Sequence, residues 1–355
     1  MKIGCIVGVR PEFIRASIVS KELRKQHEEI LIHTGQHYDY QMNSVFFDEL
    51  NISKPKYFLE VGSGSHGYQI GEMIKRIEKV LIKERPEIVL LHGDTNSTLA
   101  GSLAASKLHI KIAHVEAGLR SFDRSMPEEI NRILVDHCSD LLFCPTNNAV
   151  WNLKNEGISK GVYLTGDLTV DSLFAYKAIA EKKSNILKKL NLENKDFLVA
   201  TLHRAENIDN IGDLKNIVDA FSEIKENIVF PLHPRTEKTL KKYNLYDKFA
   251  ETVQLTEPLG FLDFLQLMSA SRMILTDSGG IQKEAYILKI PCITLRKNTE
   301  WIETIEDGWN ILVGANKKKI IEAISEFKPS SNTYSNRFGE GDAVQKIMSA
   351  VNEKI

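Results

Sequence analysis

Three carboxylates stand where the sequence predicts the edge of a sheet. Asp94 and Glu116 each come shortly after an apolar run with the length of a buried strand, and Glu128 follows a proline that opens a helical pattern. Crowded carboxylates repel one another, which raises some of their pKa values into the range that general acid–base chemistry needs. The alternative is that they act separately in helix caps and salt bridges, which suits Glu128 in a first helical turn.

Two histidine–arginine pairs occur in the second half of the chain. His203 and Arg204 follow one apolar run, and His233 and Arg235 follow another. Because ligands of open parallel sheets bind beyond the carboxyl ends of the strands, both pairs are expected at the same edge, facing the carboxylates across a cleft. A cationic cluster there favours an anionic ligand. A single histidine at a strand end, by contrast, is more often a hydrogen-bonded polar residue.

Two glycine-containing turns open helices and are typical of phosphate sites. Gly8–Glu12 follows the first apolar run, with Arg10 and Arg15 spaced to lie near the start of the helix. Ser278–Gly280 opens another helix, and Glu284 falls about one turn into it, where a carboxylate can accept hydrogen bonds from ribose hydroxyls. N–H groups and the helix dipole favour an anion at such turns. The alternative for Gly8–Glu12 is an ordinary strand–helix turn with solvated arginines.

Two other patterns resemble cofactor sites but fit them poorly. The run Gly62–Gly67 matches Gly-x-Gly-x-x-Gly, yet it is rich in serine, lies outside the first strand–helix turn and lacks a clear strand ending in Asp or Glu about 20 residues later. His109, His114 and Glu116 lie close together, but they fall in a strand-like run with a spacing that matches no usual zinc site. We therefore expect neither a nicotinamide cofactor nor a metal.

The overall charge and the cysteines limit the classes of protein to consider. The 355 residues include 46 Lys or Arg and 47 Asp or Glu, for a formal net charge of −1, which argues against binding nucleic acid or a membrane surface over a broad face. No apolar run approaches the ~20 residues of a membrane span, and Ile3–Val9 is too short for a secretory signal. Cys5, Cys138, Cys144 and Cys292 form no Cys-x-x-Cys pair, as suits a reducing cytoplasm.

Short apolar runs alternate with helical periods along the chain. The first half has predicted strands at Lys2–Val9, Glu29–Thr34, Glu87–His92, Ile110–Val115, Asp140–Cys144 and Gly161–Thr165, with helices at Pro11–Lys25, Gly67–Lys83, Ser97–Leu108 and Glu128–Cys138. The second half has predicted helices at Val170–Leu190, Gly212–Glu226, Gly260–Ala270 and Ile281–Leu288, with strands at Phe197–Leu202, Ile228–Leu232, Thr252–Leu255, Met273–Thr276 and Pro291–Leu295. Such alternation indicates parallel βαβ units. We therefore predict an α/β fold of two doubly wound, Rossmann-like domains, at residues 1–166 and 167–339, that face each other across a cleft.

Taken together, these residues resemble the non-hydrolysing UDP-N-acetylglucosamine 2-epimerases. The stretches that carry the resemblance occur in the family's order: Gly8–Glu12, His92–Thr95, His114–Arg120, Pro127–Arg132, His203–Asn207, Asp277–Ala285 and Thr299–Glu300. The resemblance implies the GT-B arrangement, with a C-terminal helix, here Asp342–Glu353 within residues 340–355, that packs back on the first domain. It also implies a cytoplasmic homodimer that acts on a nucleotide sugar without metal or NAD and serves polysaccharide biosynthesis.

The resemblance also assigns roles to residues. It implies a catalytic set of Asp94, Glu116, Glu128 and His203. The implied UDP contacts are Arg10, His203, Ser278, Gly279 and Gly280 for the diphosphate, Glu284 for the ribose, and the backbone at Pro258 and Leu259 for the uracil.

Some family members bind a second, activating UDP-N-acetylglucosamine, and Gln36, His37 and His233 resemble parts of that regulatory site. This chain departs from the family pattern in three places. Arg15 replaces the commoner lysine, Met73 takes the place of an arginine of the regulatory site, and Trp301–Glu303 replaces Arg-Pro-Glu.

The implied reaction is reversible C2 epimerisation of UDP-N-acetylglucosamine to UDP-N-acetylmannosamine, by elimination of UDP through 2-acetamidoglucal and re-addition. The residues suit this chemistry because departure of UDP makes the C2 hydrogen acidic enough for a carboxylate, while a cationic cradle stabilises the leaving group. Four alternatives stay open. They are the same reaction on a diacetamido uronic acid sugar, glycosyl transfer on the same fold, a hydrolysing epimerase, and a nucleotide-sugar sensor without turnover.

Overall fold

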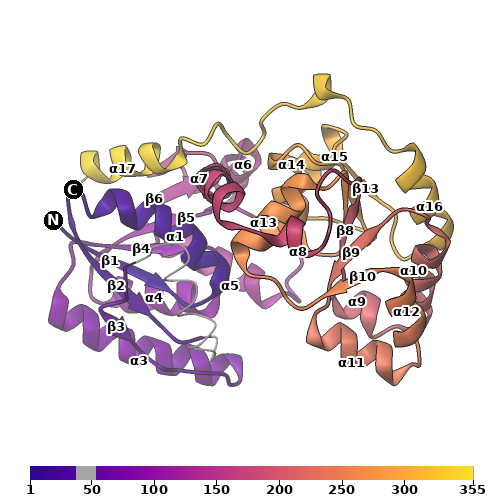
Figure 1. Cartoon of the computed structure of the whole chain (residues 1–355). Helices are drawn as coiled ribbons and strands as arrows, with labels where there is room; N and C mark the ends of the chain where they lie inside the picture. Colours follow the sequence, from indigo (N-terminus) through magenta and orange to yellow (C-terminus); the bar gives the residue numbers. More distant parts are fainter. Residues whose placement is uncertain (37–52, 355) are drawn as a thin grey trace. The chain divides into compact units, whose positions relative to one another are not determined.

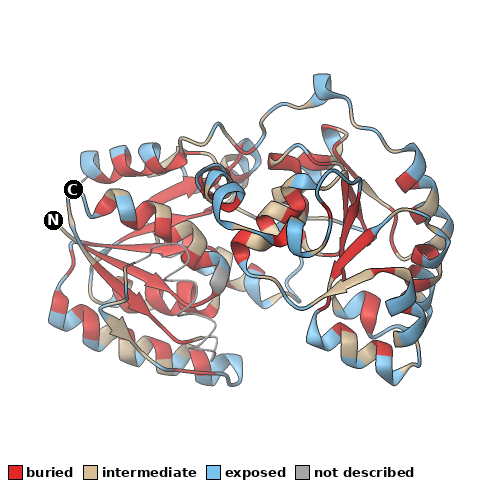
Figure 2. Cartoon of the chain, in the orientation of Figure 1, coloured by how far each residue is buried: buried red, intermediate tan, exposed pale blue. Residues whose placement is uncertain are grey.

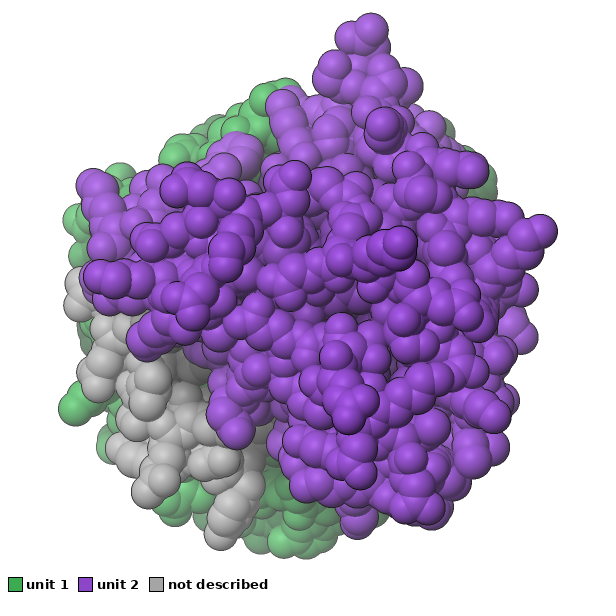
Figure 3. Space-filling view, turned by 45° about the vertical axis from the view of Figure 1, so that its right-hand side comes forward, with its two compact units in different colours: residues 1–172, 338–355 green, residues 173–337 purple. Residues whose placement is uncertain are grey.

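The computed structural model describes residues 1–36 and 53–354 (Figure 1). The chain divides into two compact units, unit 1 with Met1–Ser172 and Phe338–Ile355, and unit 2 with Leu173–Arg337, which Figure 3 shows in different colours. Within the described ranges, none of the helices combines the length and the apolar character of a membrane span.

Unit 1 is built on a sheet whose strands all pair in parallel, in the order β3-β2-β1-β4-β5-β6-β7. The strands are β1 Lys2–Val7, β2 Glu28–His33, β3 Tyr57–Phe58, β4 Ile88–His92, β5 Lys111–Val115, β6 Leu141–Cys144 and β7 Val162–Leu164. The helices are α1 Arg10–Leu23, α3 His66–Glu84, α4 Asn96–Lys107, α5 Pro127–Cys138, α6 Asn147–Asn155 and α17 Ala343–Lys354, and α7 Leu168–Lys183 runs from unit 1 into unit 2. The strand order reverses between β1 and β4, which is where open α/β sheets bind ligands.

Both faces of this sheet are buried, which explains why its strands are apolar at successive positions. Ile3, Cys5 and Val7 belong to a core shared with α1 and α17, whereas Ile6 and Ile32 belong to a second core shared with α3 and α4. Figure 2 shows the buried strands between helices whose outer surfaces are exposed. The C-terminal helix α17 is capped within unit 1, because the carboxylate of Asp171 accepts hydrogen bonds from the N–H groups of Ala343 and Val344.

Unit 2 has a parallel sheet in the order β10-β9-β8-β11-β12-β13. Its strands are β8 Leu198–Thr201, β9 Ile228–Pro231, β10 Gln254–Thr256, β11 Met273–Thr276, β12 Cys292–Thr294 and β13 Asn310–Leu312. Its helices are α8 Ile186–Lys189, α9 Ala205–Ile208, α10 Ile211–Glu223, α11 Pro234–Lys242, α12 Tyr246–Thr252, α13 Phe261–Ala270, α14 Gly279–Ile287, α15 Ile302–Glu306 and α16 Lys317–Glu326, with a 3-10 turn at Ser331–Thr333. The strand order reverses between β8 and β11, so the turns after these two strands are neighbours.

The predicted class, two doubly wound α/β domains with parallel sheets, is confirmed. The single helix predicted at Val170–Leu190 is instead α7 and α8, separated by a turn. In that turn Ser184 Oγ donates a hydrogen bond of 2.5 Å to Asp263 and accepts one from the N–H of Ile186. A serine that bonds in this way competes with the helical hydrogen bonds of the backbone, which explains the break.

Candidate functional site

At the carboxyl edge of the sheet in unit 1, Arg15 and Glu116 form a two-armed ion pair. Arg15 Nη1 donates to Glu116 Oε1 over 3.1 Å, and Nη2 lies 3.0 Å from Oε2. Gly93, with φ of +68°, passes close by, and a Cβ on it would lie 3.1 Å from Arg15 Nη2 and 3.4 Å from Glu116 Oε2. Burial works against the charge of Arg15, but Glu116, Asp167, Glu12 and Asp94 together outweigh it and raise the pKa of the guanidinium. Arg15 is thus the shared cation of several carboxylates.

Asp94 follows β4 and is held by a different arginine. Arg132 Nε donates to Asp94 Oδ2 over 2.9 Å, and Nη2 lies 2.6 Å from the same oxygen. The backbone carbonyl of Asp94 accepts a hydrogen bond of 2.9 Å from Asn131 Nδ2. The side chain of Asp94 stays 30% exposed, so it is oriented by α5 and still open to solvent.

The third predicted carboxylate is placed differently. Glu128 is exposed in the first turn of α5. Its neighbour Glu129 is buried and accepts hydrogen bonds from the N–H groups of Ser121 and Phe122. In unit 1, Arg15 therefore holds Glu116 and Arg132 holds Asp94, while Glu128 is exposed in α5.

Asp136, which is buried in α5, was not among the predicted site residues. Asp136 Oδ1 lies 2.7 Å from His114 Nδ1, and Oδ2 accepts hydrogen bonds from Arg120 Nη1 and from the N–H of Gly118. The second ring nitrogen of His114, Nε2, lies 2.7 Å from the carbonyl oxygen of Gly93. Burial opposes the charge of His114, but the hydrogen bond and charge of Asp136, together with Gly93 and Glu116, outweigh it and raise the pKa of the imidazole. This network fixes the turn that carries Asp94.

The turn after β1 binds the carboxylate of Glu12, a side chain of the helix that follows it. Glu12, which is 1% exposed, accepts hydrogen bonds from the N–H groups of Gly8 (2.6 Å) and Val9 (3.2 Å) and from the hydroxyl of Thr95 (2.7 Å). Burial raises the pKa of Glu12 to about 7, against the opposing effect of these hydrogen bonds. Two N–H groups of the expected phosphate turn are therefore occupied by Glu12. The side chain of Arg10, also predicted there, lies outside what the structure describes.

In unit 2, buried Asp277 joins the turns after β8 and β11. Its Oδ2 accepts hydrogen bonds from the N–H groups of His203 (3.0 Å) and Arg204 (2.8 Å) and from Asn207 Nδ2 (3.3 Å). His203 Nδ1 lies 3.4 Å from Asp277 Oδ1. Burial lowers the pKa of His203, and Asp277 opposes this effect. Asp277 lies in a stretch that carries the family resemblance, but nothing in its local sequence indicates that it orients His203.

Four of the predicted UDP contacts lie in α14 or at its start. Ser278 is the N-cap of this helix, and its N–H donates to Thr276 Oγ1 over 3.0 Å. Gly279 and Gly280 form the first helical positions, and half-buried Glu284 follows in the same helix. Pro258 and Leu259 lie just after β10, with Pro258 exposed and Leu259 half-buried.

The residues predicted for a second site fall in both units. Gln36 Oε1 accepts hydrogen bonds from the N–H and the hydroxyl of Ser97 at the start of α4, and Met73 is buried with its sulfur 3.8 Å from the same hydroxyl. The ring of His233, which is the N-cap of α11, lies 5.9 Å from that of His203. His37 lies outside the described residues.

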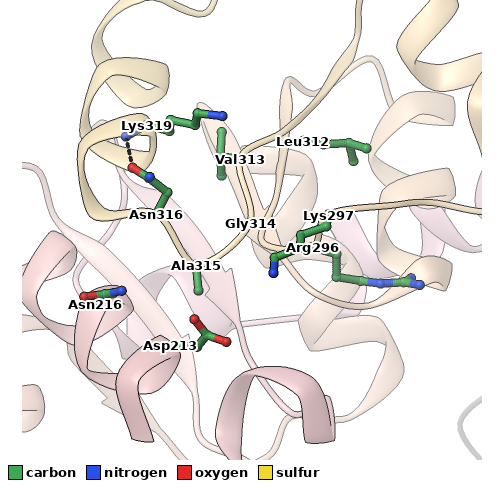
Figure 4. Close-up of a pocket in the computed structure, with 10 residues that line it drawn as sticks. All are labelled: Asp213, Asn216, Arg296, Lys297, Leu312, Val313, Gly314, Ala315, Asn316 and Lys319. Atoms are coloured by element: carbon green, nitrogen blue, oxygen red, sulfur yellow. Dashed lines mark hydrogen bonds between the residues drawn. The ribbon is translucent and has the colours of Figure 1, made fainter. Parts of the chain in front are cut away.

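Two further features bear on cofactors and ligands. In residues 1–36 and 53–354, no group of three or more His, Cys, Asp or Glu is arranged to hold a metal, and the ring of His114 is engaged by Asp136 and Gly93. Unit 2 also has a cavity of about 520 Å³ at the ends of β12 and β13 (Figure 4). Its lining residues are Asp213, Asn216, Arg296, Lys297, Leu312, Val313, Gly314, Ala315, Asn316 and Lys319.

Known proteins are similar to this chain along nearly its whole length. A family model for UDP-N-acetylglucosamine 2-epimerase matches residues 21–352. A Methanococcus maripaludis protein called a UDP-N-acetylglucosamine 2-epimerase homolog is 59% identical over 351 residues, 98% of each chain. The UDP-2,3-diacetamido-2,3-dideoxy-D-glucuronate 2-epimerase of Pseudomonas aeruginosa is 48% identical over 334 residues, 91% of each chain.

A crystal structure of the Methanocaldococcus jannaschii UDP-GlcNAc 2-epimerase, in complex with UDP-GlcNAc and UDP, superimposes with a TM-score of 0.89 at 49% identity. The match covers 99% of this chain and 100% of that one. The family resemblance of the sequence is thus confirmed along its length. The chain belongs to the UDP-N-acetylglucosamine 2-epimerase family.

Proposed function

We propose that this chain interconverts UDP-N-acetylglucosamine and UDP-N-acetylmannosamine without hydrolysing the nucleotide sugar. The observation that carries the proposal is the match of nearly the whole chain to the M. jannaschii enzyme with UDP-GlcNAc and UDP bound. The local geometry supports it, because unit 1 holds oriented carboxylates at its sheet edge and unit 2 holds a glycine turn at a helix start.

The first step is departure of UDP from C1 of the sugar. Ser278, Gly279 and Gly280 would bind the leaving diphosphate with their N–H groups, and His203 and Arg10 would supply further donors. N–H groups at a helix start and the helix dipole stabilise a developing negative charge without reorganising. In support, Asp277 fixes the backbone and the ring of His203 in one orientation.

The second step is removal of the C2 proton, which is acidic once positive charge develops at C1. Glu116 and Asp94 are the groups in unit 1 that an arginine orients at the sheet edge, and they would carry protons to and from the two faces of C2. Glu128, exposed in α5, would be a third carrier. The product, 2-acetamidoglucal, takes back a proton on the other face and then UDP, which gives the epimer. No step needs a metal or NAD.

A second candidate substrate is the UDP-linked 2,3-diacetamido-2,3-dideoxy-glucuronate. The specific observation is the 48% identity to the P. aeruginosa enzyme named for that sugar, which is close to the 50% identity to the M. jannaschii relative. Steady-state kinetics on both nucleotide sugars would decide between them. The proposal expects the higher kcat/KM with UDP-N-acetylglucosamine.

Three further parts of the proposal concern assembly, regulation and location. We propose a homodimer in the cytoplasm, to be checked by light scattering and by cell fractionation. We also propose that Gln36, His37 and His233 bind a second, activating UDP-N-acetylglucosamine. Sigmoidal dependence of the rate on substrate would support that site, and hyperbolic kinetics would argue against it.

The reaction is tested by incubating the chain with UDP-N-acetylglucosamine, with a chelator present and without NAD. The expected product is UDP-N-acetylmannosamine in equilibrium with substrate. Free N-acetylmannosamine as the main product would favour a hydrolysing epimerase, and transfer of the sugar to an added acceptor would favour a glycosyltransferase. UDP binding with no turnover would favour a sensor.

A further inference from the structure

A carboxylate of the protein itself lies beside the start of α14. The carboxylate of Glu300 lies against the backbone of Gly279. A Cβ on Gly279 would lie 1.9 Å from Glu300 Oε1 and 2.9 Å from its Cδ, so glycine is needed for this approach. The first N–H groups of a helix have no acceptor within the helix, and they favour a carboxylate for the reason that they favour a phosphate.

Arg296, which follows β12, is the cation of this contact. Its Nη1 donates to Glu300 Oε2 over 2.9 Å, and its Nη2 donates to Asn298 Oδ1 over 3.1 Å. The side chain of Arg296 is 11% exposed, and its buried Nε has no hydrogen-bond partner among the described residues. Arg296 therefore has a donor left over while it holds Glu300 beside Gly279.

The backbone around Glu300 is anchored to α14 on both sides. Thr299 Oγ1 donates to Gln282 Oε1 over 2.6 Å and accepts a hydrogen bond of 3.0 Å from the N–H of Trp301. Lys283 Nζ lies 4.4 Å from the centre of the Trp301 ring. Because its neighbours are held in this way, the Glu300 side chain can move without its backbone.

Glu300 differs from Glu12, the other carboxylate at a helix start. Glu12 belongs to the helix that it caps, is 1% exposed and accepts hydrogen bonds from the N–H groups of Gly8 and Val9, so it is part of the fold. The side chain of Glu300 comes from a separate loop and is 30% exposed. A charged ligand can therefore displace the Glu300 side chain, whereas displacing Glu12 would expose a buried carboxylate.

We propose that Arg296 binds the diphosphate of the substrate and that Glu300 keeps the place of a phosphate group until substrate arrives. On binding, the diphosphate displaces the Glu300 carboxylate from Gly279 and takes Arg296 as its partner. This inference rests on the proposed function, because it assumes that UDP binds at α14. It makes Arg296 a binding residue and Glu300 a competitor, both acting on the phosphate part of the ligand alone.

The test is calorimetric titration of the full chain with UDP and, separately, with uridine, which lacks the phosphates. Arg296→Gln should weaken UDP binding roughly ten- to a hundredfold, the effect of a lost charge-assisted hydrogen bond, and Arg296→Lys should restore part of it. Glu300→Gln should strengthen UDP binding roughly two- to fivefold, since a like charge is removed at a partly exposed site. Glu306→Gln, which alters an exposed ion pair with Arg337 in the same unit, is the matched control and should change neither affinity.

Each other result overturns the inference. If Glu300→Gln weakens UDP binding as Arg296→Gln does, Glu300 orients Arg296 and does not compete. If uridine binding changes as much as UDP binding, the two residues act on the nucleoside or on the fold. Unchanged UDP affinity in both variants would assign the pair a structural role. Failure of the wild-type chain to bind UDP would be a different result, which would contradict the proposed function itself.

Discussion

The buried Asp136 carboxylate offers a test of whether His114 is charged. The imidazole lies between two acceptors, Asp136 Oδ1 and the carbonyl oxygen of Gly93, each 2.7 Å from a ring nitrogen. Both nitrogens must carry a proton to satisfy both acceptors, so we expect an imidazolium at neutral pH. In Asp136→Asn, the new amide can donate to Nδ1, and His114 can be neutral with its remaining N–H on Gly93.

The loss of stability expected for Asp136→Asn follows from the contacts that this substitution removes. Breaking a buried ion pair costs about 3–5 kcal/mol. Arg120 keeps two hydrogen bonds of 2.7 Å to Glu156, so we expect the lower end of that range. For a unit of this size, about 3 kcal/mol corresponds to a fall in Tm of roughly 6–12 °C.

The effect should depend on pH, with a defined sign. The folded-state pKa of His114 is raised above its ordinary value of 6.5, so its contribution to stability is fully present below pH 6.5 and is lost as the pH rises through the raised pKa. Burial favours a higher pKa for Asp136, but the hydrogen bonds and charges of His114 and Arg120 together outweigh it and lower the pKa below 3.8. The contribution of Asp136 is therefore lost only as the pH falls through that lowered value.

Differential scanning calorimetry between about pH 5 and pH 9 measures both the loss of stability in Asp136→Asn and its dependence on pH. The control is Asp140→Asn, which replaces an exposed carboxylate that accepts a hydrogen bond from the N–H of Ile112. We expect the Tm of Asp136→Asn to lie well below that of wild type at low pH. The difference between the two Tm values should become smaller at high pH. If the difference in Tm between Asp136→Asn and wild type is the same at every pH, His114 does not change its charge in this range and the predicted pH dependence is wrong. A difference no larger than that of Asp140→Asn would refute the ion-pair argument.

Three further groups of substitutions test the site and the turn after β1. Asp94→Asn, Glu116→Gln and Glu128→Gln remove candidate proton carriers, and at least two should lose about 10²–10⁴-fold in kcat while UDP still binds in calorimetry; near-normal rates in all three would contradict the assignment. Ser278→Ala and Gly279→Val should weaken UDP binding, the second because its side chain would fill the place beside Gly279 that the diphosphate is proposed to take from Glu300, and wild-type affinity in both would show that the diphosphate site is misplaced. Gly8→Ala would place a Cβ 2.0 Å from Ser97 Oγ and 2.5 Å from Thr34 Oγ1, so urea unfolding should show a loss of about 1–3 kcal/mol, and no measurable loss would mean that these hydroxyls move aside.

The fold was largely predictable from the sequence because both sheets are covered by helices on both faces. Strands of this kind are continuously apolar, as in β1 and β4, and stand out between helical periods. The short strand β13 and the helix α16 were not predicted. β13 has only three residues, Asn310–Leu312, and α16 opens with three lysines that hide its apolar face.

The site was less predictable, since local sequence does not show which side chain turns inward. Glu128 and Glu129 are neighbours in α5, yet Glu129 is buried under the turn at Ser121 and Glu128 is exposed. Asp136 and Asp277 act on residues far from them in the chain, His114 and His203, through contacts that only the folded sheet creates. No spacing in the sequence indicates such pairs.

The most direct measurement of the central proposal is proton NMR of the reaction in deuterated water, with UDP-N-acetylglucosamine as substrate, chelator present and no cofactor added. If a carboxylate that exchanges with solvent removes the C2 proton, deuterium should appear at C2 of the new UDP-N-acetylmannosamine, with traces of UDP and 2-acetamidoglucal escaping. An epimer that retains hydrogen at C2 would contradict this account, because the proton would then have returned without exchange or never have left.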